Sequence, residues 1–123
     1  MYTNTSGAHA AYAQNNIDVE SPQKLIQMLY EGVLRFNLQA KRAMDNSDIE
    51  KKTYWINRSC AIFTELINTL DMSQGDVALY LSGLYSRQLE VRMSASMDND
   101  AEKLHEVNNV VKELLDAWRE VNN

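Results

Sequence analysis

The chain has 123 residues, 45% of them hydrophobic and 24% charged, and a formal net charge of −5. This length allows one domain with a single core of useful size, and the composition is ordinary for a globular protein. The Lys and Arg residues form no cluster, which argues against nucleic acid or an anionic membrane as a partner. No run reaches the 18 or so apolar residues that would span a bilayer, so we expect no membrane insertion.

Cysteine usage and the N-terminal residues indicate the compartment. Cys60 is the single cysteine, so no internal disulfide can form and a reducing environment is the default. No Lys or Arg precedes Lys24, and the first residues lack the apolar stretch of a signal peptide. We therefore expect a cytoplasmic protein.

Residues 1–20 differ from the rest of the chain because they are rich in Thr, Asn, Ser and Ala. A short helix over 8–14 is compatible with the alanines, but a helix of that length needs a surface to pack on. Tyr12, Ile17 and Val19 are the apolar residues that could anchor it. Two interpretations stay open, a frayed terminus and a detachable N-terminal cap segment that lies on an apolar groove.

Residues 21–123 divide into four stretches of similar length separated by polar breaks. Apolar residues recur in each stretch at steps of three and four, the spacing of one helical face. We expect helices at about 22–45, 48–71, 76–98 and 100–121. Helices of equal length with short connections pack side by side, so the sequence predicts an all-α, antiparallel up-down four-helix bundle, preceded by a loose or short-helical cap segment.

Residues with side chains that can cap a helix precede each stretch. Ser21 is followed by Pro22, which is favoured at the first helical position. Ser47 and Glu50 have the spacing of a capping box. The N-terminal capping residues that we expect are Ser21, Ser47, Asp76 and Asn99.

The apolar periodicity also predicts the core. We expect it to contain Ile26, Leu29, Val33, Phe36, Ala40 and Ala43 from the first helix, and Ile56, Cys60, Phe63, Ile67 and Leu70 from the second. The third helix is expected to contribute Val77, Leu81, Leu84, Val91 and Ala95, and the fourth Leu104, Val107, Val111, Leu114, Trp118 and Val121.

Helices 2 and 3 carry more apolar residues than the three in seven that a bundle needs. The additional residues are Trp55, Ile62 and Leu66 in helix 2, and Leu79, Tyr80, Tyr85 and Leu89 in helix 3. They predict a shallow groove covered by an identical subunit, a partner helix or residues 1–20. The residues that we expect to contact a partner or shape this groove are Tyr12, Ile17, Leu29, Tyr30, Ile62, Leu66, Leu81 and Tyr85.

The sequence offers little catalytic chemistry. Glu102 and His105 match the Glu-x-x-His element of di-iron bundles, but a di-metal site needs two such elements and His9 is the only other histidine. A c-type haem would need a second cysteine beside Cys60. His105 is also a formal candidate for phosphotransfer, with Glu102 and Glu106 around it. We expect no catalytic residues, no metal, no cofactor and no enzymatic activity.

Several of these segments, in this order, resemble the flagellar secretion chaperone family FliS. The matching residues are Ala11-Tyr12 with Ile17, Ser21-Pro22, Leu25–Gly32 with Phe36, Ile67–Asp71, Gly75–Ala78 with Leu81 and Leu84-Tyr85, and Leu114-Leu115 with Ala117-Trp118. The ordered set is specific, although each motif alone is weak. The chain departs from the family at Arg87-Gln88, which replaces an aromatic-Met pair and which we expect to face solvent.

The resemblance implies a chaperone that binds the disordered C-terminal segment of flagellin, which wraps round the bundle as short amphipathic helices. Binding would prevent premature polymerisation in the cytoplasm and present flagellin to the export gate. The export gate and other flagellar proteins are further candidate partners. The family's N-terminal segment covers part of the client groove until it is displaced. The alternative that the residues alone leave open is a structural homodimer built through the additional apolar stripe.

Overall fold

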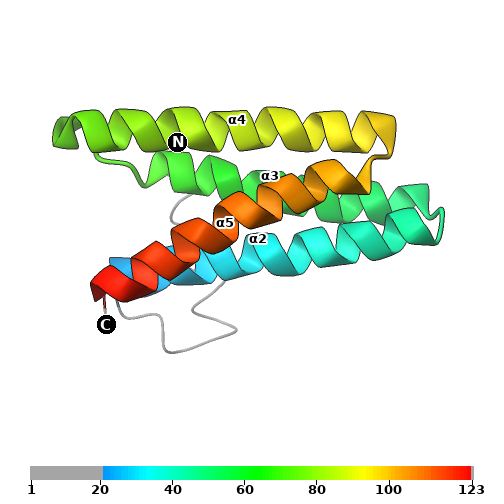
Figure 1. The fold of residues 1–123 in the computed structure, drawn as a ribbon, viewed down its shortest axis with the longest axis horizontal. Coiled ribbons are helices and arrows are strands. Elements are labelled where there is room, and N and C mark those ends of the chain that lie inside the picture. The colour runs from blue at the N-terminus through cyan, green and yellow to red at the C-terminus, as the bar shows by residue number, and fades with distance from the viewer. Residues whose placement is uncertain (1–20, 123) are drawn as a thin grey trace.

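The computed structural model describes residues 21–122 and consists there of four long helices and one short turn of 3₁₀ helix. These elements are α2 (Pro22–Asp45), α3 (Ile49–Asn68), η1 (Met72–Gln74), α4 (Asp76–Asp98) and α5 (Ala101–Asn122). The described residues contain no strand, and the all-α four-helix bundle predicted from the sequence is confirmed (Figure 1). The expected N-terminal cap segment, residues 1–20, lies outside the described residues.

The helices pack in a ring in which α2 contacts α3 and α5, and α4 contacts the same two helices from the other side. Figure 1 shows α5 beginning beside the end of α4 and then crossing the bundle toward the start of α2. α4 and α5 diverge along this path, so the first half of α4 lies far from the last half of α5. No helix in residues 21–122 is both long and apolar enough to cross a membrane.

The starts of α2 and α3 show how local hydrogen bonding sets the helix ends. Ser21 caps α2 as predicted, because its hydroxyl accepts a hydrogen bond from the Lys24 amide at 3.2 Å. The expected cap at Ser47 is wrong. Ser47 has a φ of 55° in the tight turn between the helices, and Asp48 instead accepts from the Lys51 amide at 3.1 Å. The cap is therefore displaced by one residue.

The expected caps of the last two helices are also wrong. Gly75, with a φ of 72°, precedes α4, and no side chain caps this helix. Asp76 is instead in the first turn, where its negative charge interacts favourably with the helix dipole. Asn99 ends α4 in the left-handed conformation, and the Asp100 carboxylate accepts from the Glu102 amide at 3.0 Å at the start of α5.

The end of α3 also differs from the expected boundary at residue 71. The helix ends at Asn68, and the Thr69 hydroxyl donates to the Leu66 carbonyl at 2.7 Å. Asp71 then caps η1 by accepting from the Ser73 amide. A separate short turn therefore connects α3 with α4.

The core consists of two clusters of buried apolar side chains. The larger contains Leu25, Leu29, Tyr30, Val33, Ile62, Phe63, Leu66, Tyr85, Val107, Val111 and Leu115. The smaller, near the α2–α3 turn, contains Ala40, Met44, Ile56, Ala95 and Leu104. Ile62 and Leu66, which the sequence placed beside the core stripe, are thus core residues, whereas Cys60, Ile67 and Leu70 are only partly buried.

The face of α4 that packs into the core was predicted only in part: Ala95 is buried as expected, and Leu81 and Val91 pack against the core. Val77 is 67% exposed, and the buried residues of this helix are Ala78, Tyr85, Gln88, Arg92 and Ala95. Gln88, expected in solvent, is 4% exposed, whereas Arg87 is exposed as expected. Val121 of α5 is also not a core residue, since it is 82% exposed.

Candidate partner-binding surface

An uncovered apolar stripe runs along the first half of α4. Val77, Tyr80, Leu81 and Leu84 are separated by three and four residues and therefore share one side of the helix. Val77 and Tyr80 are 67% and 68% exposed, and Leu81 and Leu84 are half-buried. We call these four residues the α4 stripe. An apolar row of this spacing on the surface is the kind of feature to which a partner helix binds.

The last part of α5 lies away from the first half of α4, which carries the α4 stripe (Figure 1). The last part of α5 packs instead beside α2, where the Trp118 indole N–H donates to the Gln23 carbonyl at 3.0 Å. Arg119 also forms an ion pair with Glu31 of α2, with Nη2 and Oε2 2.9 Å apart. These contacts hold the end of α5 on α2, so α5 does not follow α4 toward the stripe (Figure 1).

A pair of buried tyrosines lies next to the stripe in sequence and joins α4 to α2. The Tyr30 and Tyr85 hydroxyls are 2.7 Å apart, and the two side chains are 3% and 2% exposed. Tyr85 also contacts Phe63 of α3, with ring centroids 6.1 Å apart. Burial raises the pKa of both phenols, and for Tyr85 the neighbouring Tyr30 raises the pKa further. The pair is therefore neutral and fixes α4 against α2 and α3.

The structure brings most of the sequence-predicted site residues together, but below the surface. Leu29, Tyr30, Ile62, Leu66 and Tyr85 are all buried members of the larger core cluster. Leu81 is half-buried and packs against that cluster, so it alone of the described set reaches the surface. Tyr12 and Ile17 lie outside the described residues. The buried five can shape the surface above them, but direct contact with a partner would require the bundle to repack.

A second surface feature, not predicted from the sequence, joins α2 to α3. The Arg58 guanidinium lies over three aromatic rings, with its central carbon 4.9 Å from the centroid of Phe36, 5.5 Å from that of Tyr54 and 6.0 Å from that of Trp55. The Arg35 guanidinium also lies over the Phe36 ring, with its central carbon 5.4 Å from the ring centroid. Arginine and aromatic residues are enriched at protein interfaces. Only the spacing of Tyr54 and Arg58, one helical turn apart, signals this cluster in the sequence.

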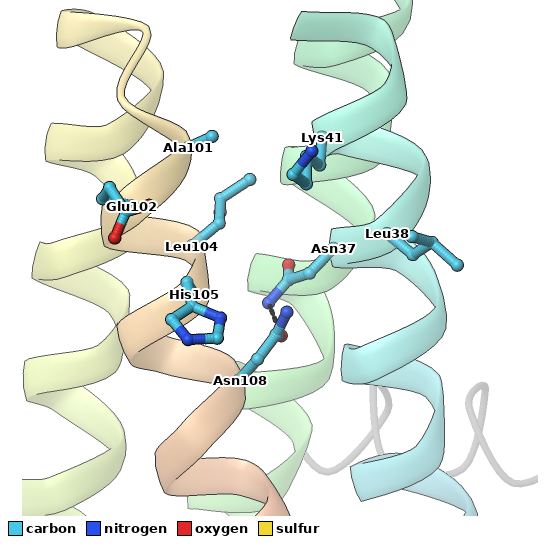
Figure 2. Close-up of a pocket in the computed structure, with 8 residues that line it drawn as sticks. All are labelled: Asn37, Leu38, Lys41, Ala101, Glu102, Leu104, His105 and Asn108. Carbon is cyan, nitrogen blue, oxygen red and sulfur yellow. Dashed lines mark hydrogen bonds between the residues drawn. The ribbon is translucent and has the colours of Figure 1, made fainter. Parts of the chain in front are cut away.

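A pocket of about 230 Å³ lies between α2 and α5 (Figure 2). It is lined by Asn37, Leu38, Lys41, Ala101, Glu102, Leu104, His105 and Asn108. Asn37 donates through Nδ2 to Asn108 Oδ1 at 2.9 Å, which links the two helices across the pocket. Glu102 and His105 face this pocket, but no group of three or more potential metal ligands occurs in residues 21–122.

Comparison with known proteins decides the family. The sequence model of the family described as "Flagellar protein FliS" matches residues 4–123. The chain belongs to the FliS family. It is 55% identical over 117 residues to the flagellar secretion chaperone FliS of Campylobacter jejuni, covering 94% of this chain and 91% of the relative. Members of this family are chaperones of flagellar secretion and not enzymes, and this chain is accordingly a chaperone of flagellum biogenesis.

More distant FliS chaperones match along nearly the same length. The FliS protein of Bacillus subtilis is 30% identical, with 91% of this chain and 84% of the relative covered. That of Salmonella typhimurium is 28% identical, with 98% of this chain and 93% of the relative covered. The similarity to FliS thus extends over the whole bundle, including the segment that carries the α4 stripe.

Proposed function

We propose that this FliS chaperone binds the disordered C-terminal segment of flagellin in the cytoplasm and lays one client helix along the α4 stripe. Covering the segment would prevent premature polymerisation and keep flagellin competent for the flagellar export gate. The observation that carries the proposal is the exposed stripe of Val77 and Tyr80, continued by Leu81 and Leu84, in a chain of this family. An amphipathic helix presents apolar residues at the same spacing, so the two rows can interdigitate.

The energetics require an apolar surface of this kind. Ordering a disordered client costs on the order of 2–5 kcal/mol before any net affinity appears. At about 25 cal/mol per Å², roughly 200 Å² of apolar burial offsets the upper figure. Two large, mostly exposed side chains with two half-buried neighbours form a surface on which a client helix can begin to recover that cost.

The N-terminal segment would compete with the client. In this proposal residues 1–20 form a cap unit separate from the bundle of residues 21–123, and Tyr12 and Ile17 dock on the surface that the client later takes. Deleting residues 1–17 is then expected to tighten binding of a flagellin C-terminal peptide, because the client no longer displaces a resident segment. Unchanged affinity and enthalpy in calorimetry would remove the competing cap while leaving client binding intact.

The stripe itself is tested by a matched pair of variants. Val77→Ser with Tyr80→Ser removes the two most exposed members of the stripe, whereas Leu79→Ser changes a residue that is 64% exposed on another side of the same helix. We expect at least a tenfold loss of affinity for a fluorescent flagellin C-terminal peptide in the first variant and less than a twofold change in the second. Equal affinity in both variants would place the client elsewhere.

The alternative, a structural homodimer, gives a different result in the same preparation. An obligate dimer buries a large apolar interface and stays associated on dilution. Sedimentation at nanomolar concentration that shows a dimer with no affinity for flagellin would replace the proposed function. A monomer that binds the peptide supports it.

A further inference from the structure

Arg92 of α4 is a fully buried cation that has no carboxylate partner among residues 21–122. Its side chain is 0% exposed, and Nη1 donates to the Cys60 sulfur of α3 at 3.0 Å. Its guanidinium carbon also lies 4.6 Å from the centroid of the Phe63 ring. The remaining donors, Nε and Nη2, are buried and have no hydrogen-bond partner within residues 21–122. Such a group is costly because a guanidinium keeps its charge at all physiological pH values.

The surroundings of Arg92 favour an anion at this position. Burial lowers the pKa of Arg92, and the adjacent Cys60 is the neighbour that acts in the opposite direction. The ion pairs of the described residues, Lys41–Asp45, Asp98–Lys103 and Glu31–Arg119, do not include it. The face of the Phe63 ring partly stabilises the positive charge, but the ring cannot accept hydrogen bonds from both free N–H groups. Cys60 itself is a free, half-buried cysteine.

We propose that Cys60 is a site of oxidation by hydrogen peroxide, and that Arg92 binds the anionic sulfinate product through Nη1, which already contacts the sulfur, and through the neighbouring, unpartnered Nη2. A guanidinium is well suited to a sulfinate because it can donate two roughly parallel hydrogen bonds to two oxygens. The unpartnered donors thus give the cysteine an anion-binding environment that a lone buried thiol lacks. This site is independent of the α4 stripe and of the proposed flagellin client.

The chemistry consumes two equivalents of peroxide. In the first step the Cys60 sulfur attacks one peroxide oxygen, an S–O bond forms, the O–O bond breaks, and the other oxygen leaves as water with the thiol proton. The sulfur is oxidised by two electrons to the sulfenic acid while one peroxide is reduced. In the second step a further peroxide adds the second oxygen in the same way, yielding a sulfinate, a proton and water. Arg92 supplies no electrons and acts as a positioning residue.

The test measures oxidation and stability together on the full chain. Protein treated with excess hydrogen peroxide is expected to gain about 32 Da at Cys60, located by peptide mass spectrometry, and Cys60→Ser shows no such gain at this position. The purified sulfinate form should then be more stable to thermal unfolding than the reduced protein. We expect the melting temperature of the wild type to rise by at least about 4 °C more than that of Cys60→Ser under the same treatment, because exposed methionines such as Met97 are oxidised in both proteins.

Arg92→Leu is the diagnostic comparison, because leucine is apolar and uncharged and, unlike methionine, is not oxidised by peroxide. In this variant the same oxidation should lower the melting temperature, since a charged sulfinate then lies in an apolar site without a donor. A purely structural Arg92 would leave the sign of the shift unchanged between the two proteins. If Arg92→Leu does not fold, Arg92→Lys provides the comparison with a smaller stabilisation expected. Oxidation that destabilises the wild type as much as the variant, or no oxidation of Cys60, would overturn the proposal.

Discussion

Replacing Tyr85 by Phe removes one hydroxyl from a buried pair whose oxygens lie 2.7 Å apart. The other hydroxyl, on Tyr30, is then left in a site where its side chain is only 3% exposed. Leaving a buried polar group without a partner costs about 1–3 kcal/mol. Phe otherwise keeps the ring contact with Phe63, so the loss reports on the hydroxyl pair and not on packing. Tyr30→Phe is expected to cost a similar amount.

The double variant, Tyr30→Phe with Tyr85→Phe, separates this explanation from simple loss of a contact. Both hydroxyls are absent, no orphan remains, and two apolar rings of the same shape occupy the site, so the total cost should stay below about 1 kcal/mol. The two changes are then strongly non-additive, with a coupling energy of about 1–3 kcal/mol.

Urea denaturation followed by circular dichroism measures all three variants against the wild type. Tyr80→Phe is the control, since this tyrosine is 68% exposed and its change should stay within about 0.5 kcal/mol. Additive costs in the double variant would refute the reasoning, because they would mean that each hydroxyl acts independently of the other.

Three further predictions follow from the same helices. The stability that Tyr30 and Tyr85 contribute should be constant from neutral pH to about pH 10 and then fall by up to about 1.4 kcal/mol per pH unit for each tyrosine, because their raised pKa values let the unfolded state ionise first. Urea midpoints measured across alkaline pH check this, and an equal fall in the double Phe variant would contradict it. Ser21→Ala should lower the free energy of unfolding by about 1 kcal/mol, because it removes the acceptor of the Lys24 amide, whereas Ser21→Gly should cost only a few tenths of a kcal/mol. Equal losses for the two variants in denaturant melts would argue against the cap. Phe63→Ala should cost about 3–5 kcal/mol, since the ring is 0% exposed, and a thermal or urea loss below about 1 kcal/mol would show that the core is loosely packed there.

The extent to which the fold follows from the sequence differs from helix to helix. In α5 the apolar residues occupy one side, and Leu104, Val107 and Val111 are buried as predicted. In α4 apolar residues occur on several sides, so periodicity could not identify the core face, and Val77 was placed inside although it is mostly exposed. Buried polar residues add to this difficulty. A charged residue such as Arg92 is expected in solvent from the sequence alone, although it lies on the core face of α4.

The candidate site shows the same limit. Spacing identifies which residues share a side of a helix, but it does not say which side meets the core. Leu66, which was expected beside the core stripe and as a residue that contacts a partner or shapes the groove, is therefore a buried core residue. The excess of apolar residues on α4 was detectable, and Tyr80 belongs to it. The exposure of Tyr80 depends on how the four helices pack, which includes contacts such as that of Trp118 with α2. Contacts between residues this distant in sequence leave no periodic signal.

Calorimetric titration of the full chain with a flagellin C-terminal peptide at several temperatures tests the central claim most directly. A client helix that covers the α4 stripe buries apolar surface, so the account predicts saturable binding with a negative heat-capacity change. That heat-capacity change should shrink in Val77→Ser with Tyr80→Ser and persist in Leu79→Ser. Absence of saturable heat at every temperature, or a heat-capacity change that both variants keep in full, would contradict it.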